Sequence, residues 1–359
     1  MARTPGPSKR TRFPRRAGSG SRSRGVRLRP PREIVNDVDR IVALLRARTK
    51  FDFGPYKRST LSRRIQRRMQ LAHVTRPADY LQRLRSDTTE VNALLKDFRI
   101  GVTSFFRDPQ AWQVLERDVL GPLLAAKPSA ARVRIWVPGC ATGEEAYSIA
   151  MVVIEQLQAA RKSCEVQIFA TDVDHAALRF ARHGVYPESI AADVPPDRLH
   201  AFFTREERSY RIAKNVREVV LFAEQNLITD PPFSQIDLIR CCNLLMYLEP
   251  AVQARVMPLL HYALADGGYV VFGRAESIRR PDLFATVSKK WRIYRRIGST
   301  RRTGPLFPIG SVQGANPALS PERDVRSVVK DVGALIEPLI LKRFGPAAIL
   351  INRQISRNI

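Results

Sequence analysis

Hydrophobic residues change their spacing near residue 132. From there on, short apolar runs alternate with stretches at helical spacing, which is typical of a mostly parallel sheet with helices on both faces. The expected strands are Arg132–Val137, Val166–Ala170, Val219–Ala223, Ile236–Arg240, Tyr269–Gly273 and Trp291–Arg295. The expected helices between them include Glu144–Gln158, Asp174–His183 and Pro250–Leu264. No long helical pattern joins the last two strands, which allows a reversed strand at the edge of the sheet.

Residues 33–100 are expected to form a small helical bundle, because their apolar residues recur at helical spacing. In the stretch KRSTLSRRIQRRMQL, the apolar residues Leu61, Ile65 and Met69 lie on one helix face. Arginines cover the rest of this helix, and few acidic residues balance them. A solvated helix face without a partner is one explanation of this charge.

The regular alternation is absent in three other parts of the chain. Residues 184–217 break it, which predicts an inserted subdomain at one edge of the sheet. Residues 298–322 are rich in Pro, Gly and Ser and are expected to be a linker. Residues 323–359 contain one helical pattern and one apolar strand, too little to bury a core, so we expect the beginning of a further domain. Residues 1–32 contain eleven Lys or Arg and no Asp or Glu, which predicts a disordered basic tail.

Composition and charge narrow the class of function. No apolar run approaches the roughly 20 residues that span a bilayer, so no membrane insertion is expected. The spacing of the 4 cysteines fits no zinc site, so we expect no metal. The cysteines are few and the adjacent pair is not expected to form a disulfide, so we expect a cytoplasmic location. A net charge of +26 is typical of proteins that bind nucleic acid, so nucleic acid is one candidate partner. Much of that charge lies in the tail and in one helix, so no specific nucleic acid is expected.

The stretch RIWVPGCATGEEAYSIAM, residues 134–151, carries the clearest chemical signal. An apolar strand leads into a turn with Gly139 and Gly143, and a helix follows, as at nucleotide-like cofactor sites in open α/β sheets. Glu144 and Glu145 put negative charge at the helix entrance, where a dinucleotide phosphate needs positive potential. A cationic ligand such as S-adenosylmethionine (AdoMet) therefore fits better. The alternative is a turn whose glycines serve only close packing.

Three further motifs place polar residues where such a ligand binds. Asp172 ends the next strand and is placed to accept both ribose hydroxyls of an adenosine, whereas Asp174 can cap the following helix. Asn243 and Tyr247 follow a buried strand, and a ligand contact or a purely structural role is equally supported. Arg107 follows two phenylalanines at the junction of the two halves, where it can face a cleft or solvent.

These motifs resemble those of CheR-type chemotaxis receptor methyltransferases over residues 35–297. The matching segments, in family order, are GVTSFFRDP, VPGCATGEEAYSIAM, FATDVD, HGVYPESI, QNLITDPPF, CCNLLMYLEP and GGYVVFG. The chain is most similar to the methyltransferase part of sensory proteins that also contain methylesterase-like and PAS domains, and LIEPLILKRFGPAAILIN resembles the start of a PAS segment. The implied fold is an α/β, Rossmann-like AdoMet-dependent methyltransferase domain (101–297) with a small N-terminal helical domain and an inserted edge subdomain.

The resemblance implies methyl transfer from AdoMet to glutamate side chains of chemotaxis-type receptors, with S-adenosylhomocysteine as the product. It implies a set of AdoMet-binding residues: Thr103, Arg107, Glu145, Asp172, Asn226, Leu227 and Asn243. Glu145 would contact the methionine part, and Arg107 and Tyr247 would be catalytic, side by side at the transfer site. The basic helix becomes a candidate docking face for the acidic helical methylation region of a receptor, with the residues Lys57, Arg63, Arg64, Arg67 and Arg68.

The chain departs from the family pattern at three places. Cys242 stands where members usually carry an arginine of the cofactor site, and Gly101 stands where some relatives have asparagine. The TREERSYRI segment lacks the glycine of a loop that grips a receptor's C-terminal pentapeptide, so no such tethering is expected. Two other functions stay open: a catalytically weak AdoMet-binding sensory or scaffold module, and a nucleic-acid methyltransferase. The second is disfavoured because the chain has no NPPY-type or PC-type catalytic motif.

Overall fold

The computed structural model describes residues 32–49, 51–99, 101, 103–278 and 280–298. All of them belong to one compact unit, Met1–Phe307. Apart from Arg32 and Gly298 at their boundaries, the expected basic tail, linker and PAS-like segment lie outside the described residues. None of the helices that the structure describes has the length and hydrophobicity needed to cross a membrane.

The N-terminal part is a bundle of the helices α1 (Arg32–Thr49), α2 (Arg58–Leu71), α3 (Pro77–Ser86) and α4 (Thr88–Phe98). The apolar stripe of α2, Leu61, Ile65 and Met69, is buried in the shared core as its spacing predicted. Helix α4 begins at an N-cap, where the Asp87 carboxylate accepts a hydrogen bond from the backbone N–H of Glu90.

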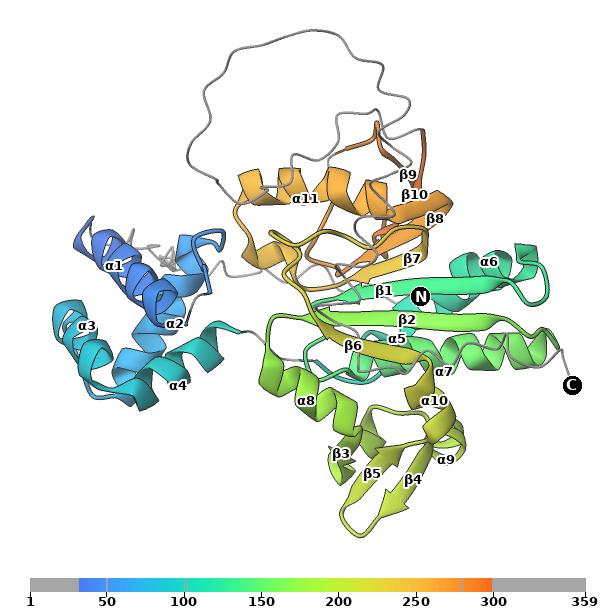
Figure 1. The fold of residues 1–359 in the computed structure, drawn as a ribbon, viewed down its shortest axis with the longest axis horizontal. Coiled ribbons are helices and arrows are strands. Elements are labelled where there is room, and N and C mark those ends of the chain that lie inside the picture. The colour runs from blue at the N-terminus through green and yellow to red at the C-terminus, as the bar shows by residue number, and fades with distance from the viewer. Residues whose placement is uncertain (1–31, 50, 100, 102, 279, 299–359) are drawn as a thin grey trace, which may run out of the picture. The chain divides into compact units, whose positions relative to one another are not determined.

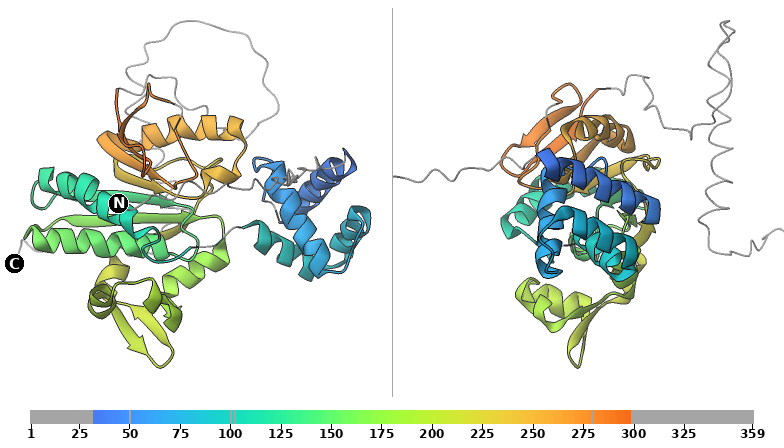
Figure 2. Two further views of the ribbon diagram at one scale, coloured as in Figure 1. Left: turned by 180° about the vertical axis from the view of Figure 1, so that it is seen from behind. Right: turned by 90° about the vertical axis from the view of Figure 1, so that its left-hand side faces the viewer.

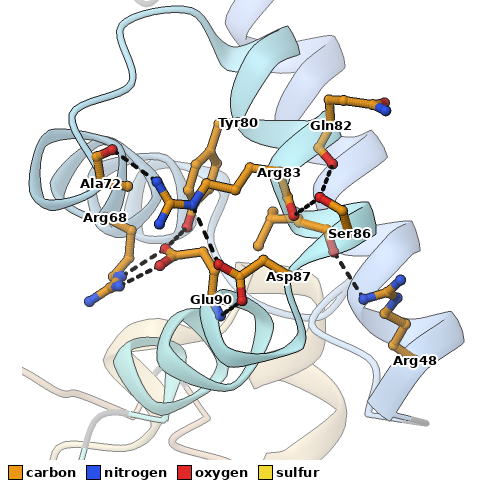
Figure 3. Close-up of polar contacts among 10 residues, drawn as sticks. Arg48, Arg68, Ala72, Tyr80, Gln82, Arg83, Ser86, Asp87 and Glu90 are labelled. Carbon is orange, nitrogen blue, oxygen red and sulfur yellow. Dashed lines mark hydrogen bonds and ion pairs between the residues drawn. The ribbon is translucent and has the colours of Figure 1, made fainter.

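A buried carboxylate joins three helices of the bundle (Figure 3). Arg68 of α2 donates to both oxygens of Glu90 on α4, at 3.1 and 2.7 Å, and the hydroxyl of Tyr80 on α3 donates to the same carboxylate at 2.7 Å. Glu90 is only 5% exposed. Burial raises the pKa of the Glu90 carboxyl, but the hydrogen bonds from Arg68 and Tyr80 outweigh it, so the pKa lies below its ordinary value. The Arg68 charge is therefore part of the bundle's interior.

The α/β part is built on a sheet of β1 (Arg132–Pro138), β2 (Glu165–Asp172), β6 (Val220–Glu224), β7 (Ile236–Cys241), β8 (Leu264–Phe272), β9 (Phe284–Ser288) and β10 (Ile293–Arg296). The strand order is β6-β2-β1-β7-β8-β10-β9. The strands from β6 to β8 are parallel, and β10 runs antiparallel to β8. The expected α/β fold is confirmed.

The edge of the sheet differs from the prediction. The expected reversed strand exists as β10, but β9 lies outside it and pairs with it antiparallel, so β10 is not the edge. Sequence analysis missed β9 because its three central residues are exposed and it presents no continuous apolar run. A short strand of this kind is typical of a protected sheet edge.

Helices cover both faces of the sheet (Figures 1 and 2). The α7 helix (Glu144–Ala159) lies on one face and α11 (Pro250–Ala263) on the other. Alternation along β1 divides its side chains between two cores, because successive residues of a strand point to opposite faces. Val133, Ile135 and Val137 join the core on the α7 side, and Trp136 joins the core that contains the α11 residues.

A helix between the bundle and β1 was largely missed from the sequence. It runs as α5 (Pro109–Leu115), a π-helical turn η1 (Glu116–Leu120) and α6 (Gly121–Ala126). Pro122 interrupts the helical pattern because it has no N–H to donate. The chain absorbs this proline with the wider π turn, in which the backbone N–H of Gly121 bonds to the carbonyl of Glu116.

The segment after α8 (His175–His183) forms the inserted subdomain. It contains β3 (Val185–Pro187), η2 (Glu188–Ala192), α9 (Pro196–Phe202), β4 (Phe203–Glu206), β5 (Ser209–Ile212) and α10 (Lys214–Glu218). Its strands make a small antiparallel sheet of order β3-β5-β4. Arg198 of α9 binds Glu155 of α7 at 2.7 Å and Glu116 at 2.8 Å, which fixes the insert against the main domain.

We expect Arg68→Met to lower the free energy of unfolding by about 3 kcal/mol, because it leaves the buried Glu90 carboxylate without its counter-ion. Arg63→Met, at an exposed position of the same helix, should change it by about 0.5 kcal/mol or less. Urea denaturation at pH 7 measures both, and equal losses would contradict the buried network. Since the pKa of Glu90 is lowered in the fold, the stabilisation is present above its ordinary value of 4.5 and is lost as the pH falls through the lowered value.

Candidate functional site

The turn between β1 and α7 is held tightly against the end of β2. The backbone N–H groups of Gly139 and Cys140 both donate to the carbonyl of Thr171, at 2.7 and 3.0 Å. Gly139 and Gly143 have φ of +73° and +92°, and a Cβ on Gly143 would lie 2.9 Å from the Cβ of Ala181. The glycines therefore allow close packing, and this packing brings the turn to the carboxyl end of the sheet, where Gly139 lines both pockets.

Two hollows open at the carboxyl ends of the parallel strands and share Gly139, Ala141 and Asn243 in their walls. They are named the Asp172 pocket and the Glu145 pocket. The walls of the Asp172 pocket also include Tyr56, Phe98, Arg99, Asn226, Leu227 and Tyr247. The walls of the Glu145 pocket also include Thr103, Arg107, Trp112, Arg240, Cys242 and Gly273. The two acidic residues expected at opposite ends of one ligand thus lie in adjoining pockets on the same edge of the sheet.

Asp172 is the last residue of β2, and each of its oxygens accepts one backbone hydrogen bond. Oδ2 accepts from the N–H of Ala141 and Oδ1 from the N–H of Asp174, both at 2.9 Å. Burial raises the pKa of Asp172, and these two bonds oppose the rise. Each oxygen keeps acceptor capacity for a hydroxyl group. Asp174 caps α8 by accepting from Ala176 and Ala177, as predicted, so the two aspartates have separate roles.

Residues of the helical bundle close the Asp172 pocket, a contribution that sequence analysis missed. Tyr56 forms an antiparallel bridge with Leu248, and the backbone N–H of Lys57 donates to the carbonyl of Tyr247 at 2.8 Å. Burial, with the nearby Asp172 charge, raises the pKa of Tyr56 to about 12, so its hydroxyl stays protonated at neutral pH. No local pattern in the sequence marks Tyr56, because its role depends on contacts with the 243–248 loop.

The Glu145 pocket contains an ion pair that sequence analysis also missed. Arg240 of β7 donates from Nε to Glu145 in the first turn of α7, and their side chains are 6% and 16% exposed. The guanidinium carbon of Arg240 lies 4.2 Å from the ring centre of Trp112. Glu144 instead accepts from the hydroxyl of Thr142 at 2.6 Å, and burial raises its pKa. Of the two carboxylates at the helix entrance, Glu145 is the one that lines the pocket.

Asn243, common to both pockets, is held by a buried acid. Its φ is +57°, and its backbone N–H donates to Glu276 Oε2 at 2.9 Å. The same carboxylate accepts from the N–H groups of Gly273 and Met246, and burial raises its pKa. A Cβ on Gly273 would lie 2.6 Å from Oδ1 of Asn243, so only glycine fits there. Glu276 is a positioning residue, and its only sequence signal is an acid shortly after the end of β8.

The other expected cofactor residues lie in the same walls. Asn226 and Leu227 line the Asp172 pocket, and Oδ1 of Asn226 accepts from the N–H of Ile228 at 3.0 Å. Thr103 lines the Glu145 pocket. Arg107 is exposed in the wall of the Glu145 pocket, whereas Tyr247 lies in the wall of the Asp172 pocket. The two residues expected side by side are therefore in different pockets.

The five basic residues proposed for docking fall into two groups. Lys57 binds the carbonyl of Met246 through Nζ at 2.7 Å, Arg64 binds the carbonyl of Asp97, and Arg68 pairs with Glu90. Arg63 and Arg67 are exposed on α2.

Within the described part of the chain, no three His, Cys, Asp or Glu side chains gather as metal ligands.

Comparison with known proteins gives matches over both parts of the structure. The family described as "CheR methyltransferase, SAM binding domain" matches residues 101–293, and "CheR methyltransferase, all-alpha domain" matches residues 36–98. The first match covers nearly all of the sheet, the Glu145 pocket and most of the Asp172 pocket. The second covers nearly all of the helical bundle, including Tyr56 and Phe98 of the Asp172 pocket.

Similar proteins come from several bacteria. An uncharacterized 104.1 kDa protein of Rhodobacter capsulatus is 39% identical over 266 residues, which cover 74% of this chain and 28% of that protein. The protein Cher3 of Pseudomonas putida is 29% identical over 277 residues, which cover 72% of this chain and 96% of that protein. A chemotaxis protein methyltransferase of Listeria monocytogenes is 29% identical over 230 residues, which cover 64% of this chain and 86% of that protein. The chain belongs to the CheR methyltransferase family, and its sheet domain is the S-adenosylmethionine-binding domain of that family.

Proposed function

We propose that this protein transfers a methyl group from AdoMet to glutamate side chains of chemotaxis-type receptors and releases S-adenosylhomocysteine. The observation that carries the proposal is the placement of Asp172 and Glu145 in adjoining pockets of the AdoMet-binding domain, with an exposed arginine in the wall of the second. The Listeria monocytogenes relative is named a chemotaxis protein methyltransferase, which supports a receptor substrate.

The residues present fit the cofactor. The Asp172 carboxylate keeps acceptor capacity for the two hydroxyls of a ribose, and Asn226 and Leu227 line the same pocket, where the adenosine part would be held. The Glu145 carboxylate offers an acceptor for the ammonium group of the methionine part. When bound, AdoMet supplies an electrophilic methyl group on a sulfonium centre.

The protein's own task at the substrate is to position a carboxylate and to exclude water. A glutamate side chain has an ordinary pKa of about 4.3, so it is ionised at pH 7 and needs no general base. Arg107, exposed in the wall of the Glu145 pocket, can orient this carboxylate through paired hydrogen bonds. The guanidinium must orient the substrate carboxylate without strongly stabilising its negative charge, because that charge is lost as the ester forms. Tyr247 would give a second orienting contact from the adjoining pocket.

Docking of the substrate would use the exposed charge of α2. Arg63 and Arg67 suit the acidic helical methylation region of a receptor, and few acidic residues in this helix compete with that partner. Arg68 takes no direct part, because it is bound to Glu90.

A catalytically weak AdoMet-binding module is the second candidate. The position of Cys242 in the Glu145 pocket favours it, since a thiol replaces the arginine that the family resemblance led us to expect there. Burial raises the pKa of the Cys242 thiol well above its ordinary value, so the thiol contributes no charge at neutral pH. Cofactor binding without methyl transfer would support this candidate.

We expect Asp172→Asn to weaken S-adenosylhomocysteine binding about 10- to 100-fold, because hydrogen bonds to a charged acceptor contribute about 1.5–3 kcal/mol. The hydroxyls donate to the ionised form, and the pKa of Asp172 is raised in the free protein. Wild-type affinity should therefore hold at neutral pH and fall as the pH drops through the raised value, while Asp172→Asn loses this dependence. Calorimetry across pH measures both. Asp197→Asn, exposed on α9, is the control, and an unchanged affinity in Asp172→Asn would rule out the ribose role.

We expect Arg107→Gln to lower the methylation rate about 100-fold and Tyr247→Phe about five- to tenfold, through loss of substrate orientation and of one hydrogen bond. The measurement is radiolabelled methyl transfer to a receptor fragment, followed by alkaline release of the ester label. The exposed residues Arg255 and Tyr262 on α11 give the matched controls Arg255→Gln and Tyr262→Phe. Alkali-stable label on RNA in place of protein would instead indicate a nucleic-acid methyltransferase.

Reversing the exposed charge of α2 with Arg63→Glu and Arg67→Glu should raise the KM for a receptor fragment roughly tenfold and reduce its salt dependence. S-adenosylhomocysteine affinity should stay unchanged, because neither residue lines a pocket. Arg208→Glu with Arg255→Glu makes the same charge change at exposed positions elsewhere. If both double variants raise the KM equally, docking on α2 is wrong.

A further inference from the structure

A buried arginine occupies the inner wall of the Glu145 pocket. Arg240 projects from β7 and is 5% exposed, and its hydrogen bond to Glu145 uses only Nε of the guanidinium. Burial would lower the pKa of Arg240, but the charge and hydrogen bond of the Glu145 carboxylate raise it, so the side chain stays charged. A buried charge pair is destabilising unless its remaining hydrogen-bonding groups find partners. This pair lines a pocket, where a ligand can supply them.

A second donor lies beside the guanidinium. Trp112 is 3% exposed and lines the same pocket, and Arg240 stacks over its ring. The Nε1–H of Trp112 has no hydrogen-bond partner among the described residues. Buried indole N–H groups usually find an acceptor. The combination of a stacked guanidinium and an unpartnered indole N–H is suited to a bound anion.

The charges around the pocket agree with an anionic group. The charged residues in the wall of the Glu145 pocket are three arginines and two acids: Arg107, Arg240, Arg274, Asp108 and Glu145. Arg107 is exposed, and the 4.0 Å pair of Arg274 and Asp108 is 64% and 45% exposed. Arg240 is buried and the Glu145 side chain is only 16% exposed, so the interior presents one negative and one positive group. A ligand carrying both an ammonium and a carboxylate matches them, whereas a purely cationic ligand does not.

We propose that Arg240 and Trp112 bind the α-carboxylate of the methionine part of AdoMet while Glu145 binds its ammonium group. The proposal rests on the placement of the methionine part in the Glu145 pocket. The zwitterion then inserts into a buried ion pair, and each protein charge exchanges its partner for the opposite charge on the ligand. Position 240 supplies the guanidinium that the family resemblance led us to expect at position 242, and both residues line this pocket.

The test compares two ligands that share the adenosine part. S-adenosylhomocysteine carries the amino-acid group and 5′-methylthioadenosine lacks it, so the ratio of their affinities reports on the Glu145 pocket alone. By calorimetry, Arg240→Met should lower affinity for S-adenosylhomocysteine about tenfold or more and leave 5′-methylthioadenosine binding unchanged. Trp112→Phe should lower the first affinity about threefold to tenfold, again without change in the second.

Matched variants separate ligand recognition from folding. Arg240→Met leaves Glu145 without a counter-ion, so the double variant Arg240→Met with Glu145→Gln removes both charges together. It should bind 5′-methylthioadenosine as the wild type does and lose the preference for S-adenosylhomocysteine. The double variant Arg240→Met with Cys242→Arg moves the positive charge from position 240 to position 242 and should restore part of that preference. A merely structural role of Arg240 would not produce this recovery.

Two results would overturn the inference. One is an unchanged ratio of the two affinities in Arg240→Met, and the other is an equal loss for both ligands in the charge-free double variant. Methyl transfer is not part of this readout. A protein that shows the expected ratios but labels no receptor would contradict glutamate methylation and leave the carboxylate site in place.

Discussion

The arrangement of both pockets depends on the hydrogen bonds that join the turn after β1 to the end of β2. The N–H groups of Gly139 and Cys140 share the carbonyl of Thr171, and the N–H of Ala141 binds the carboxylate of Asp172. These bonds make the glycine turn a common wall with the acid on one side and the entrance of α7 on the other. Ala141 has φ of +47°, an uncommon conformation for a residue with a side chain, and this local strain is sustained by the surrounding contacts.

Periodic features of the chain were predictable from sequence because their cause is local. The central strands β1 and β7 are largely buried apolar runs, and α2 carries an apolar stripe, so spacing alone indicates them. The edge strand β9 has only Phe284 fully buried, and the helix from Pro109 to Ala126 is interrupted by Pro122. In both, tertiary packing decides the backbone conformation against a weak or contrary local pattern.

Within the site, the position of a residue along its strand could be inferred from the sequence, whereas the residues it contacts could not. Asp172 could be found because it ends a strand next to a glycine turn. Arg240 could not, because its partner Glu145 is 95 residues away and an arginine inside an apolar strand gives no sign of a counter-ion. The same holds for Tyr56 and Glu276, whose contacts lie in other elements. Sequence therefore indicated many of the residues that line the two pockets, while the charge balance inside them required coordinates.

Helix α2 separates residues that stabilise the bundle from charged residues that are exposed to solvent. One stripe packs inward, Arg68 is paired with Glu90, and Arg63 and Arg67 are exposed. Under the proposed docking on α2, substitutions at the last two positions would change the charge offered to a partner, while the core of the bundle and the cofactor domain stay the same. On that proposal, the choice of partner can change in evolution independently of the methyl-transfer chemistry.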